Sequence, residues 1–499
     1  MNKKFMKKNE ANKFDLFKKI VFSIHGISIQ EIIDQNGDSK STIYRYIQQI
    51  NEDLTQAFPN QFVQINQKST LLFISIPESM NVAYVIDYLR FYYITVSPEY
   101  TIFAAAADKN YSSLESLAQS VNLSPSYTYK NLTSLNRILK PFNIKTAFGD
   151  DSNKTNIYGK ESDIRFFLFF GYWSILKGLF WPFYRSPKYF EELPTPISTT
   201  LSPSQDTRIR YFQNITYWRI LYLQEKIIIE EDFLSYLLIL NNENPTTFTI
   251  SFDNVLSDDE LKTEQAYFGY LARFFISDID TNETKKRTAQ LLIDSDLPLA
   301  AICKKLLTLL QKKYNLLIDT EDFQFFFYHL MIALLYIKYI RIDYETLWEQ
   351  EERQFSLDSD DDEFYIVEKE LYSLTRSFFK DVSFSNKKIS DGLVNYMVNL
   401  LYYIIDSSKK IKPLKIFCQY SKNFYTVGNI KTNLLTIFGE QVIHFSKTIN
   451  DADIVISDCY EGNIDNNSFF YFDNPFDPNI WKTLSAFVNS QLHNTSCFE

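Results

Sequence analysis

Apolar and polar positions recur in the same order twice within the first 150 residues. At an offset of 85 residues, segments 28–54 and 113–139 align without gaps, and each contains apolar residues at helical spacing on both sides of a short break. Such a match indicates an internal repeat, which bears directly on architecture. The identical pairs are Ser28 and Ser113, Ser39 and Ser124, Ser41 and Ser126, Tyr44 and Tyr129, Asn51 and Asn136, and Leu54 and Leu139.

Each copy predicts a helix, a turn and a second helix. In the first copy the sequence NGD at 36–38 interrupts the helical pattern, and Gly37 suits the positive φ of a tight turn. Ser39 and Ser124 are the predicted N-caps of the second helices, and Pro125 is favoured at the first helical position. The predicted inward-facing residues are Ile29, Ile32, Ile33, Ile43, Ile47, Ile50 and Leu54 in the first copy, and Leu132, Leu135 and Leu139 in the second.

The second helix of each copy is the predicted DNA-recognition helix. Its polar face combines short hydroxyl groups, tyrosines and a cation near the N-terminus, which suits contacts to phosphates and base edges. One helical hairpin with serine caps is a weak indication of DNA binding, but two copies in register favour it. The predicted DNA-contacting residues are Lys40, Ser41, Thr42, Tyr44 and Arg45 in the first copy, and Ser124, Ser126, Tyr127, Tyr129, Lys130 and Asn131 in the second.

A β-hairpin, or wing, is predicted after each helix pair. Residues 62–76 alternate apolar and polar side chains with a turn near Gln67 and Lys68, and residues 144–159 turn at 149–151. Winged helix-turn-helix domains place such a hairpin against the flanking DNA. The predicted phosphate contacts outside the recognition helices are Lys68, Lys145, Lys154 and the lysine-rich first residues.

The middle of the chain is predicted to form two helical bundles, because its pattern is mostly helical, rich in aromatic residues and poor in glycine. A looser repeat places Asn214 of the first bundle opposite His329 of the second. Residues 166–183 are apolar enough to suggest a membrane span, but Lys177 lies inside them and Pro182 ends them, so a core helix is predicted. The looser repeat pairs 211–227 with 325–342 and 264–277 with 391–405.

The pattern changes after the KKIKP segment at 409–413, where a small α/β domain is predicted. Apolar strand-like segments and helical segments follow one another in the order β-α-β-β-α, which argues for a parallel sheet. The predicted strands are 414–420, 452–459 and 469–474, and the predicted helices are 429–442 and 479–492. The expected fold is therefore multidomain and mainly α, with helix-turn-helix domains at 1–80 and 81–160, bundles at 161–283 and 284–408, and an α/β domain at 409–499.

Charge is distributed unevenly along the chain. The net charge is −10 and the pI is near 5.2, yet residues 1–150 contain 16 Lys and Arg against 13 Asp and Glu. An acidic body repels DNA, so contact is expected to be confined to the mildly basic front. The acidic run at 356–363 is predicted to be a solvated loop, because its spacing does not fit an EF-hand.

The remaining composition argues against several classes of protein. The basic N-terminal segment is not followed by the apolar stretch of a signal peptide, and the four cysteines form no C-x-x-C pair. No two of the four histidines have metal-ligand spacing, and no nucleophile motif accompanies them. We therefore expect a cytoplasmic protein that is not an enzyme and that uses no metal or cofactor.

The arrangement as a whole resembles the Mga-type (Mga/AtxA-like) transcriptional regulators of Gram-positive bacteria over essentially the full chain. The most specific segments are SLAQSVNLSPSYTYKNLTSLNRIL at 116–139 and YGKESDIRFFLFFGYW at 158–173. The resemblance implies that the bundles are phosphotransferase-system regulation domains (PRDs) and that the tail is EIIB-like. It also implies a DNA-binding regulator, expected to be an activator of global, virulence or carbohydrate-linked genes.

The same resemblance implies a set of partners. They are double-stranded promoter DNA, a second copy of the chain bound through the C-terminal domain and the PRDs, phosphotransferase-system phosphocarrier proteins, and RNA polymerase. No membrane partner is expected.

A role for His329 follows from the resemblance to PRDs, in which a histidine before a hydrophobic helix with a basic end accepts phosphate. The segment YHLMIALLYIKYIR at 328–341 is similar to that pattern. Phosphorylation adds nearly two negative charges and can repel or order a neighbouring domain. A buried structural histidine is the alternative. Because the first bundle has Asn214 at the corresponding position, control by two phosphohistidines is not expected.

Cys418 ends the first predicted strand of the tail, where an EIIB domain has its phosphocysteine. The following loop, QYSKNFYTVGN, lacks the glycine-rich cradle that offers backbone N–H groups to phosphate, so the tail is predicted to be a vestigial EIIB domain used for dimerisation. An alternative function is a phosphotransferase-system component or phosphate-relay sensor that uses Cys418 and His329 without binding DNA. A third, an interaction protein, has no positive motif.

Overall fold

The structure is a computed structural model that divides into two units, which are described separately. The first unit comprises Met1–Leu309, Asp319–Asp358 and Leu371–Leu400, and the second comprises Leu310–Ile318, Ser359–Glu370 and Leu401–Glu499. Part of the predicted turn of the second wing, most of the KKIKP segment and nearly all of the acidic run at 356–363 lie outside the described residues. Those residues are 2–23, 25–149, 154–182, 193–197, 200–343, 363–382, 384, 388–408, 413–423, 425–459, 461 and 468–495.

The first helix-turn-helix domain forms largely as the repeat predicts. Gly37 ends the first helix of the motif with φ 73°, and the Ser39 side chain accepts a hydrogen bond from a backbone N–H in the first turn of the next. Ile33 and Ile47 are only half-buried, and Tyr46 joins the core. The helices are α1 (Asn2–Phe5), α2 (Lys8–Phe22), α3 (Ile29–Asn36) and α4 (Lys40–Ala57).

The wing of the first domain is a three-stranded antiparallel sheet in the order β1-β3-β2. The strands are β1 (Ile27–Ser28), β2 (Gln64–Lys68) and β3 (Leu71–Ser75). The turn lies at Ser69 and Thr70, two residues after the predicted Gln67 and Lys68, and Ser69 adopts φ 57°. Side-chain alternation specifies which face of a strand is buried but not where the hairpin turns, and this turn has no glycine to mark it.

The second helix-turn-helix domain repeats the same plan. The Ser124 side chain accepts a hydrogen bond from the Tyr127 backbone N–H, and Pro125 occupies the first helical position, as predicted. The three residues predicted to face inward, Leu132, Leu135 and Leu139, are all buried. The elements are α5 (Val82–Thr95), α6 (Pro98–Asp108), α7 (Leu114–Ser120), α8 (Pro125–Leu139), η1 (Lys140–Phe142), β4 (Lys145–Thr146) and β5 (Ile157–Tyr158).

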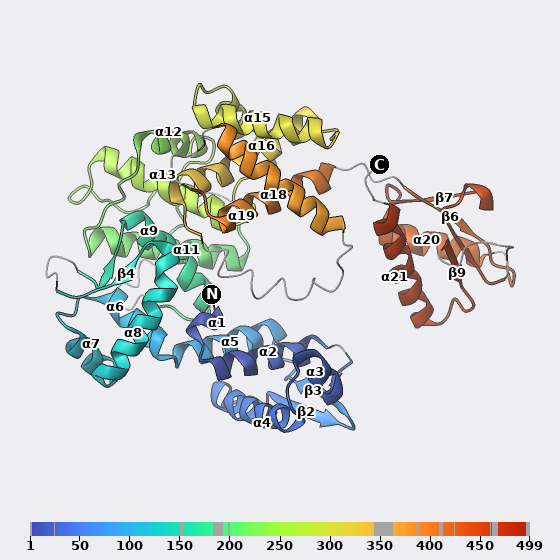
Figure 1. The fold of residues 1–499 in the computed structure, drawn as a ribbon, viewed down its shortest axis with the longest axis horizontal. Helices are drawn as coiled ribbons and strands as arrows, with labels where there is room; N and C mark the ends of the chain where they lie inside the picture. Colours follow the sequence, from blue (N-terminus) through green and yellow to red (C-terminus); the bar gives the residue numbers. More distant parts are fainter. Residues whose placement is uncertain are drawn as a thin grey trace. The chain divides into compact units, whose positions relative to one another are not determined.

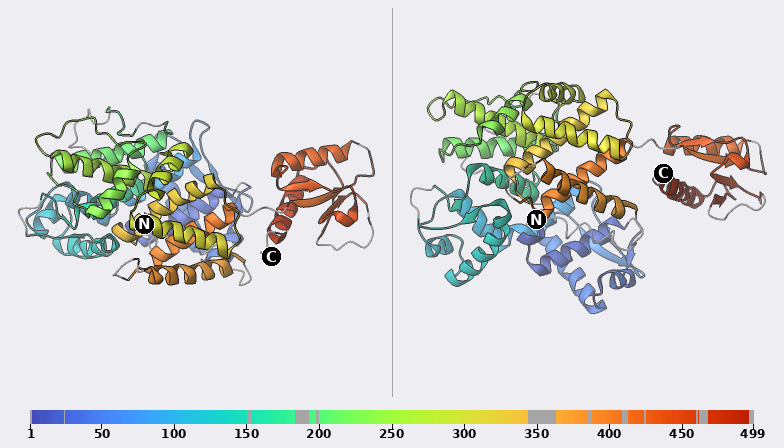
Figure 2. Two further views of the ribbon diagram at one scale, coloured as in Figure 1. Left: turned by 90° about the horizontal axis from the view of Figure 1, so that it is seen from above. Right: turned by 45° about the horizontal axis from the view of Figure 1, so that its top comes forward.

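Helices make up the rest of the first unit, and Figures 1 and 2 show them packed into one continuous helical region (green to orange) beside the two helix-turn-helix domains. The predicted repeat aligns α11 with α16 and α13 with α19. The helices are α9 (Glu161–Leu176), α11 (Pro203–Leu221), α12 (Glu231–Leu240), α13 (Asp258–Phe275), α14 (Asn282–Ile293), α15 (Pro298–Lys313), α16 (Thr320–Leu335) with the π-helical η2 (Tyr336–Ile340), α18 (Glu363–Asp381) and α19 (Asp391–Ser408), of which α15, α18 and α19 also enter the second unit.

Helix α9 is buried on nearly all sides, so the first part of the apolar segment 166–183 is a core helix as predicted; the helix ends at Leu176, where Lys177 adopts φ 44°. One side packs on the second helix-turn-helix domain, where the Phe167 ring lies 5.3 Å from Phe103 and 4.7 Å from Phe142. Another side packs on the first bundle, where Phe169 stacks on Phe212 at 4.3 Å. Helix α9 therefore belongs to the cores of both domains.

A buried ion network joins α9 to α11 and α13. Arg165 donates to Glu161 at 2.7 Å and to both carboxylate oxygens of Glu264, and Arg219 donates to Glu161. The Arg165 and Glu264 side chains are 2% and 1% exposed. With two arginines and two glutamates, the network is electrically balanced, as buried charges require.

One described helix is long and apolar enough to cross a membrane by length and composition, the continuous segment Thr320–Ile340. Within the protein, 67% of its most apolar window is buried. A core helix meets the same criterion.

The second unit contains a four-stranded parallel sheet in the order β7-β6-β8-β9. The predicted parallel α/β domain is thus present, but β7 was not predicted. The helix expected at 429–442 ends at Phe438, because Gly439 adopts φ 80° and the chain then enters β7. The elements are β6 (Leu414–Cys418), α20 (Thr426–Phe438), β7 (Ile443–Phe445), η5 (Ile449–Asp451), β8 (Ile454–Ser457), β9 (Phe469–Tyr471) and α21 (Pro478–Thr495).

Candidate nucleic-acid interface and phosphorylation site

The N-terminal turns of α4 and α8 present the polar surfaces that the sequence predicts. Lys40, Ser41, Tyr44 and Arg45 are exposed on α4, and Thr42 is half-buried. These helix N-termini carry partial positive charge and unpaired N–H groups, which favour phosphate. On α8 the exposed residues are Ser124, Ser126, Tyr127, Tyr129 and Lys130, with Tyr129 at 65%.

Asn131 does not belong to this surface. It is 7% exposed, and its side-chain amide donates to the Tyr127 carbonyl oxygen at 2.8 Å. The helical period turns position 131 toward the core, next to the buried Leu132 and Thr128. The prediction of a DNA contact by Asn131 is therefore corrected to a structural role within α8.

One acidic residue of the first recognition helix, Asp53, does not add its negative charge to the predicted DNA-binding surface. Asp53 points inward, where it pairs with Lys13 and accepts a hydrogen bond from the Tyr93 hydroxyl at 2.7 Å. Its negative charge is therefore neutralised inside the domain. Burial, together with this carboxylate, raises the pKa of Tyr93.

The wings carry the predicted cations at the surface. Lys68 and Lys145 are exposed, and exposed Lys154 donates to the Gln224 side chain at 3.3 Å. Asn156, which the sequence did not single out, is fully buried at the base of the second wing. Its side chain accepts from the Tyr111 backbone N–H and donates to three oxygens, so it fixes the wing to the segment between α6 and α7.

His329 lies on α16 at the edge of a cavity of about 530 Å³. Its Nδ1 is 2.9 Å from the Phe325 carbonyl oxygen, which can only accept, so Nδ1 carries the proton and Nε2 carries the lone pair of the neutral ring. Burial lowers the pKa of His329 by more than the hydrogen bond to Phe325 raises it, and Lys285 lowers it by a smaller amount that opposes Asp278. His329 is only half-buried.

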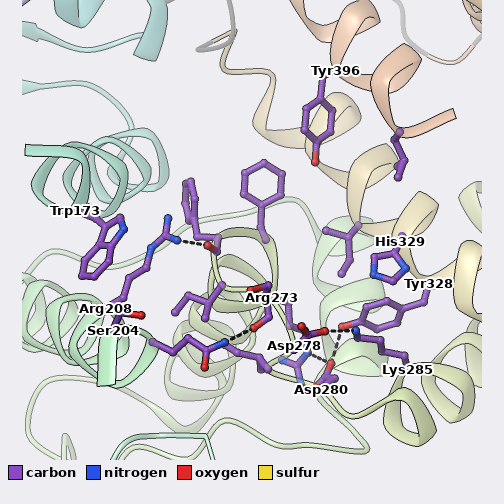
Figure 3. A pocket seen from close by; sticks show the side chains of 18 residues that line it. Trp173, Ser204, Arg208, Arg273, Asp278, Asp280, Lys285, Tyr328, His329 and Tyr396 are labelled. Carbon is purple, nitrogen blue, oxygen red and sulfur yellow. Dashed lines mark hydrogen bonds and ion pairs between the residues drawn. The ribbon is translucent and has the colours of Figure 1, made fainter. Parts of the chain in front are cut away.

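Charged groups gather at the His329 end of this cavity (Figure 3). Lys285 is 5% exposed and donates to Asp278 at 2.9 Å. Tyr328 and Arg273 both donate to the buried Asp280. Figure 3 places Trp173, Ser204 and Arg208 at the opposite end.

Asn214 makes the same local contact as His329, which supports the loose repeat of the two bundles. Its amide donates to the Arg210 carbonyl oxygen, four residues earlier, at 2.9 Å. Unlike His329, Asn214 has 0% exposure. The Asn214 amide cannot accept phosphate, and because the side chain is fully buried, a partner protein cannot reach it.

Cys418 is buried at the carboxyl end of β6, and burial raises the pKa of its thiol to about 12. The loop that follows is occupied by an internal anion: Asp458 accepts from the Ser421 backbone N–H at 2.6 Å and from its hydroxyl at 2.8 Å. Phosphoryl acceptance needs a thiolate and free N–H groups, and both are suppressed here. The assignment of this domain as a vestigial EIIB domain stays a prediction.

Two winged helix-turn-helix domains with exposed recognition-helix N-termini define a DNA-binding protein. Residues 85–172 match the Mga helix-turn-helix domain family, which supports a DNA-binding transcriptional regulator of the Mga type. The match begins within α5, covers the second helix-turn-helix domain and ends within α9. No curated protein matches the chain significantly. Among the described residues, no group of three or more His, Cys, Asp and Glu side chains could hold a metal ion.

Proposed function

We propose that this protein is a cytoplasmic activator that binds promoter DNA through α4 and α8 together. The observation that carries the proposal is the pair of capped recognition helices, whose exposed N-terminal faces lie in the net-basic part of an otherwise acidic chain. Because only the front of the chain is basic, each copy of the chain is expected to bind with modest affinity, and because that affinity comes from cation–phosphate contacts, it is expected to depend strongly on salt.

Gel-shift titration of duplexes selected by the protein from a random library tests this assignment. Lys130→Ala and Arg45→Ala should each weaken binding by roughly 5- to 50-fold at fixed salt. Lys262→Ala, at an exposed lysine on α13, is the matched control and should bind like wild type. Unchanged affinity in both recognition-helix variants would reject the assignment.

Phosphorylation of His329 is the proposed regulatory input. The neutral Nε2 can attack the phosphorus of a phosphohistidine on a phosphocarrier protein, forming one N–P bond while the carrier's N–P bond breaks. Lys285 lies close enough to influence the pKa of His329 and supplies a cation for the new phosphate. The phosphate on His329 would then compete with the Asp278 carboxylate for Lys285, which lies near the N-terminus of α14.

Incubation with phosphoenolpyruvate and the general phosphotransferase proteins tests this input. His329→Ala should abolish acid-labile labelling, whereas the exposed His444→Ala should retain it. Label that persists in the first variant would show that another residue accepts the phosphate. The alternative, a relay without DNA binding, receives no support from the buried Cys418.

Homodimerisation through the second unit, with a contribution from the bundles, is proposed to raise the affinity for DNA. Support comes from the edge strand β9, where Tyr471 is 56% exposed, and from Phe476, which is 86% exposed. Sedimentation of the full chain should show a dimer that Tyr471→Ser with Phe476→Ser weakens. Phe62→Ser, at a 67% exposed aromatic residue of the first domain, is the control. RNA polymerase is the proposed target of the DNA-bound dimer.

A further inference from the structure

An asparagine on each recognition helix holds the first strand of the following wing. In the first domain, the Asn51 side chain accepts from the Ile65 backbone N–H at 2.7 Å and donates to the Ile65 carbonyl oxygen at 3.0 Å. Ile65 lies in β2, the edge strand of the sheet, and its other neighbour across the ladder is Ile74. Asn51 thus supplies the pairing that the outer edge of β2 otherwise lacks.

The second domain contains the same pair of hydrogen bonds. Asn136 accepts from the Thr146 backbone N–H at 2.7 Å and donates to the Thr146 carbonyl oxygen at 3.3 Å. The Thr146 hydroxyl also donates to Asn136 at 2.9 Å. Thr146 lies in β4, whose ladder partner is Ile157. We call this two-bond arrangement the asparagine clasp.

The two clasps form although the chain reaches them by different routes. Asn51 and Asn136 are equivalent in the sequence repeat, but 14 residues separate Asn51 from Ile65 and only 10 separate Asn136 from Thr146. If the contact resulted only from the length of the connecting chain, the shorter connection in the second domain would not form it. The retained feature is therefore the contact between the recognition helix and the wing.

We infer that Asn51 and Asn136 are wing-positioning residues, which fix each wing to its recognition helix so that both reach DNA as one rigid unit. The inference rests on the proposed binding mode, in which the wing cations contact phosphates. Lys145 is adjacent to the clasped Thr146, and Lys68 lies three residues beyond the clasped Ile65 in the same strand. A wing held in this way contacts phosphates without the entropic cost of ordering it on the DNA.

Hydroxyl-radical footprinting of the full-length protein on a selected duplex tests the inference. Asn136→Ala should remove protection of the backbone at one end of the footprint, and Asn51→Ala should remove it at the other, while both retain protection of the backbone beside the recognition helices. Each variant should bind roughly 3- to 30-fold more weakly and lower the salt slope of log K by about one per lost phosphate contact. Gln48→Ala, at an exposed side chain of α4 outside the clasp, should leave the footprint intact.

The outcomes separate the inference from the proposed function. Failure of the wild-type protein to select any duplex would reject DNA binding itself. Selection by wild type with an unchanged footprint and salt slope in both alanine variants would reject wing positioning alone. Asn136→Asp keeps the acceptor for the Thr146 N–H but replaces the donor with an anionic oxygen that repels the Thr146 carbonyl, so it also opens the clasp if Asn136→Ala does not fold. Loss of all protection in a folded Asn136→Asp protein, beside the recognition helices as well as at the flanks, would also overturn the inference.

Discussion

Removing one charge from the buried network around α9 should destabilise the first bundle strongly. Glu264 accepts from Arg165 through both oxygens and from the Ile227 backbone N–H at 2.9 Å. Glu264→Gln keeps the shape but leaves two buried arginines facing only Glu161. Breaking a buried pair by neutralising one partner typically costs 3–5 kcal/mol, so we expect a loss of about 3 kcal/mol in the free energy of unfolding.

Urea unfolding followed by tryptophan fluorescence measures this loss, because Trp218 is buried next to Arg219 and reports on the network. Lys262→Met breaks an exposed pair with Asp259 and should cost less than about 0.5 kcal/mol. Arg165→Met combined with Glu264→Leu should cost about 1–3 kcal/mol less than the sum of the two single changes, since the double variant leaves no unpaired charge at that position. A loss below about 1 kcal/mol for Glu264→Gln would refute the electrostatic account of the network.

Three further predictions concern single groups. Burial raises the pKa of Asp163 to about 6 against the smaller effects of Lys160 and Asn143, so its contribution to stability is full below the unfolded pKa and is lost as the pH rises through 6. Asp163→Asn should therefore gain about 1–3 kcal/mol on wild type between pH 4 and pH 8 in urea titrations, and parallel curves would contradict this. Cys418, with its pKa raised to about 12, should react with iodoacetamide at pH 8 far more slowly than the half-buried Cys459, as mass spectrometry of digests can show. Ser124→Ala removes an N-cap and should lower stability by about 1 kcal/mol; a normal melting curve would contradict the capping role.

The sequence predicted local structure well where it repeats or carries a cap. The serine caps, the Gly37 turn and the buried α9 all follow from rules that act within a few residues. The second copy of the sequence repeat folds in the same way as the first, with a recognition helix capped by the predicted serine. By contrast, β7 is only three residues long and follows closely on a helical pattern, so the predicted helix at 429–442 was extended up to its first residue and the strand was missed.

Contacts between distant residues could not be predicted in the same way. Asn51 and Asn136 were visible as an identical pair, but nothing local shows that they bind Ile65 and Thr146 at different separations. Arg165 and Glu264 are 99 residues apart, so only the packed fold reveals their pairing. Asn131 was misassigned because a one-residue step along a helix moves a side chain by about 100°, enough to transfer it from the surface to the core.

The position of α9 in two cores has a consequence for how such a regulator can evolve. A recombination event at residue 160 would deliver a DNA-binding domain without Phe167, the ring that fills the space between Phe103 and Phe142. Exchange of promoter specificity between relatives by domain shuffling would therefore have to carry α9 along, and with it Phe169 and its partner surface on α11. The heritable unit of DNA recognition in this chain thus extends beyond the helix-turn-helix domain, and the bundle surface that packs on α9 is inherited with it.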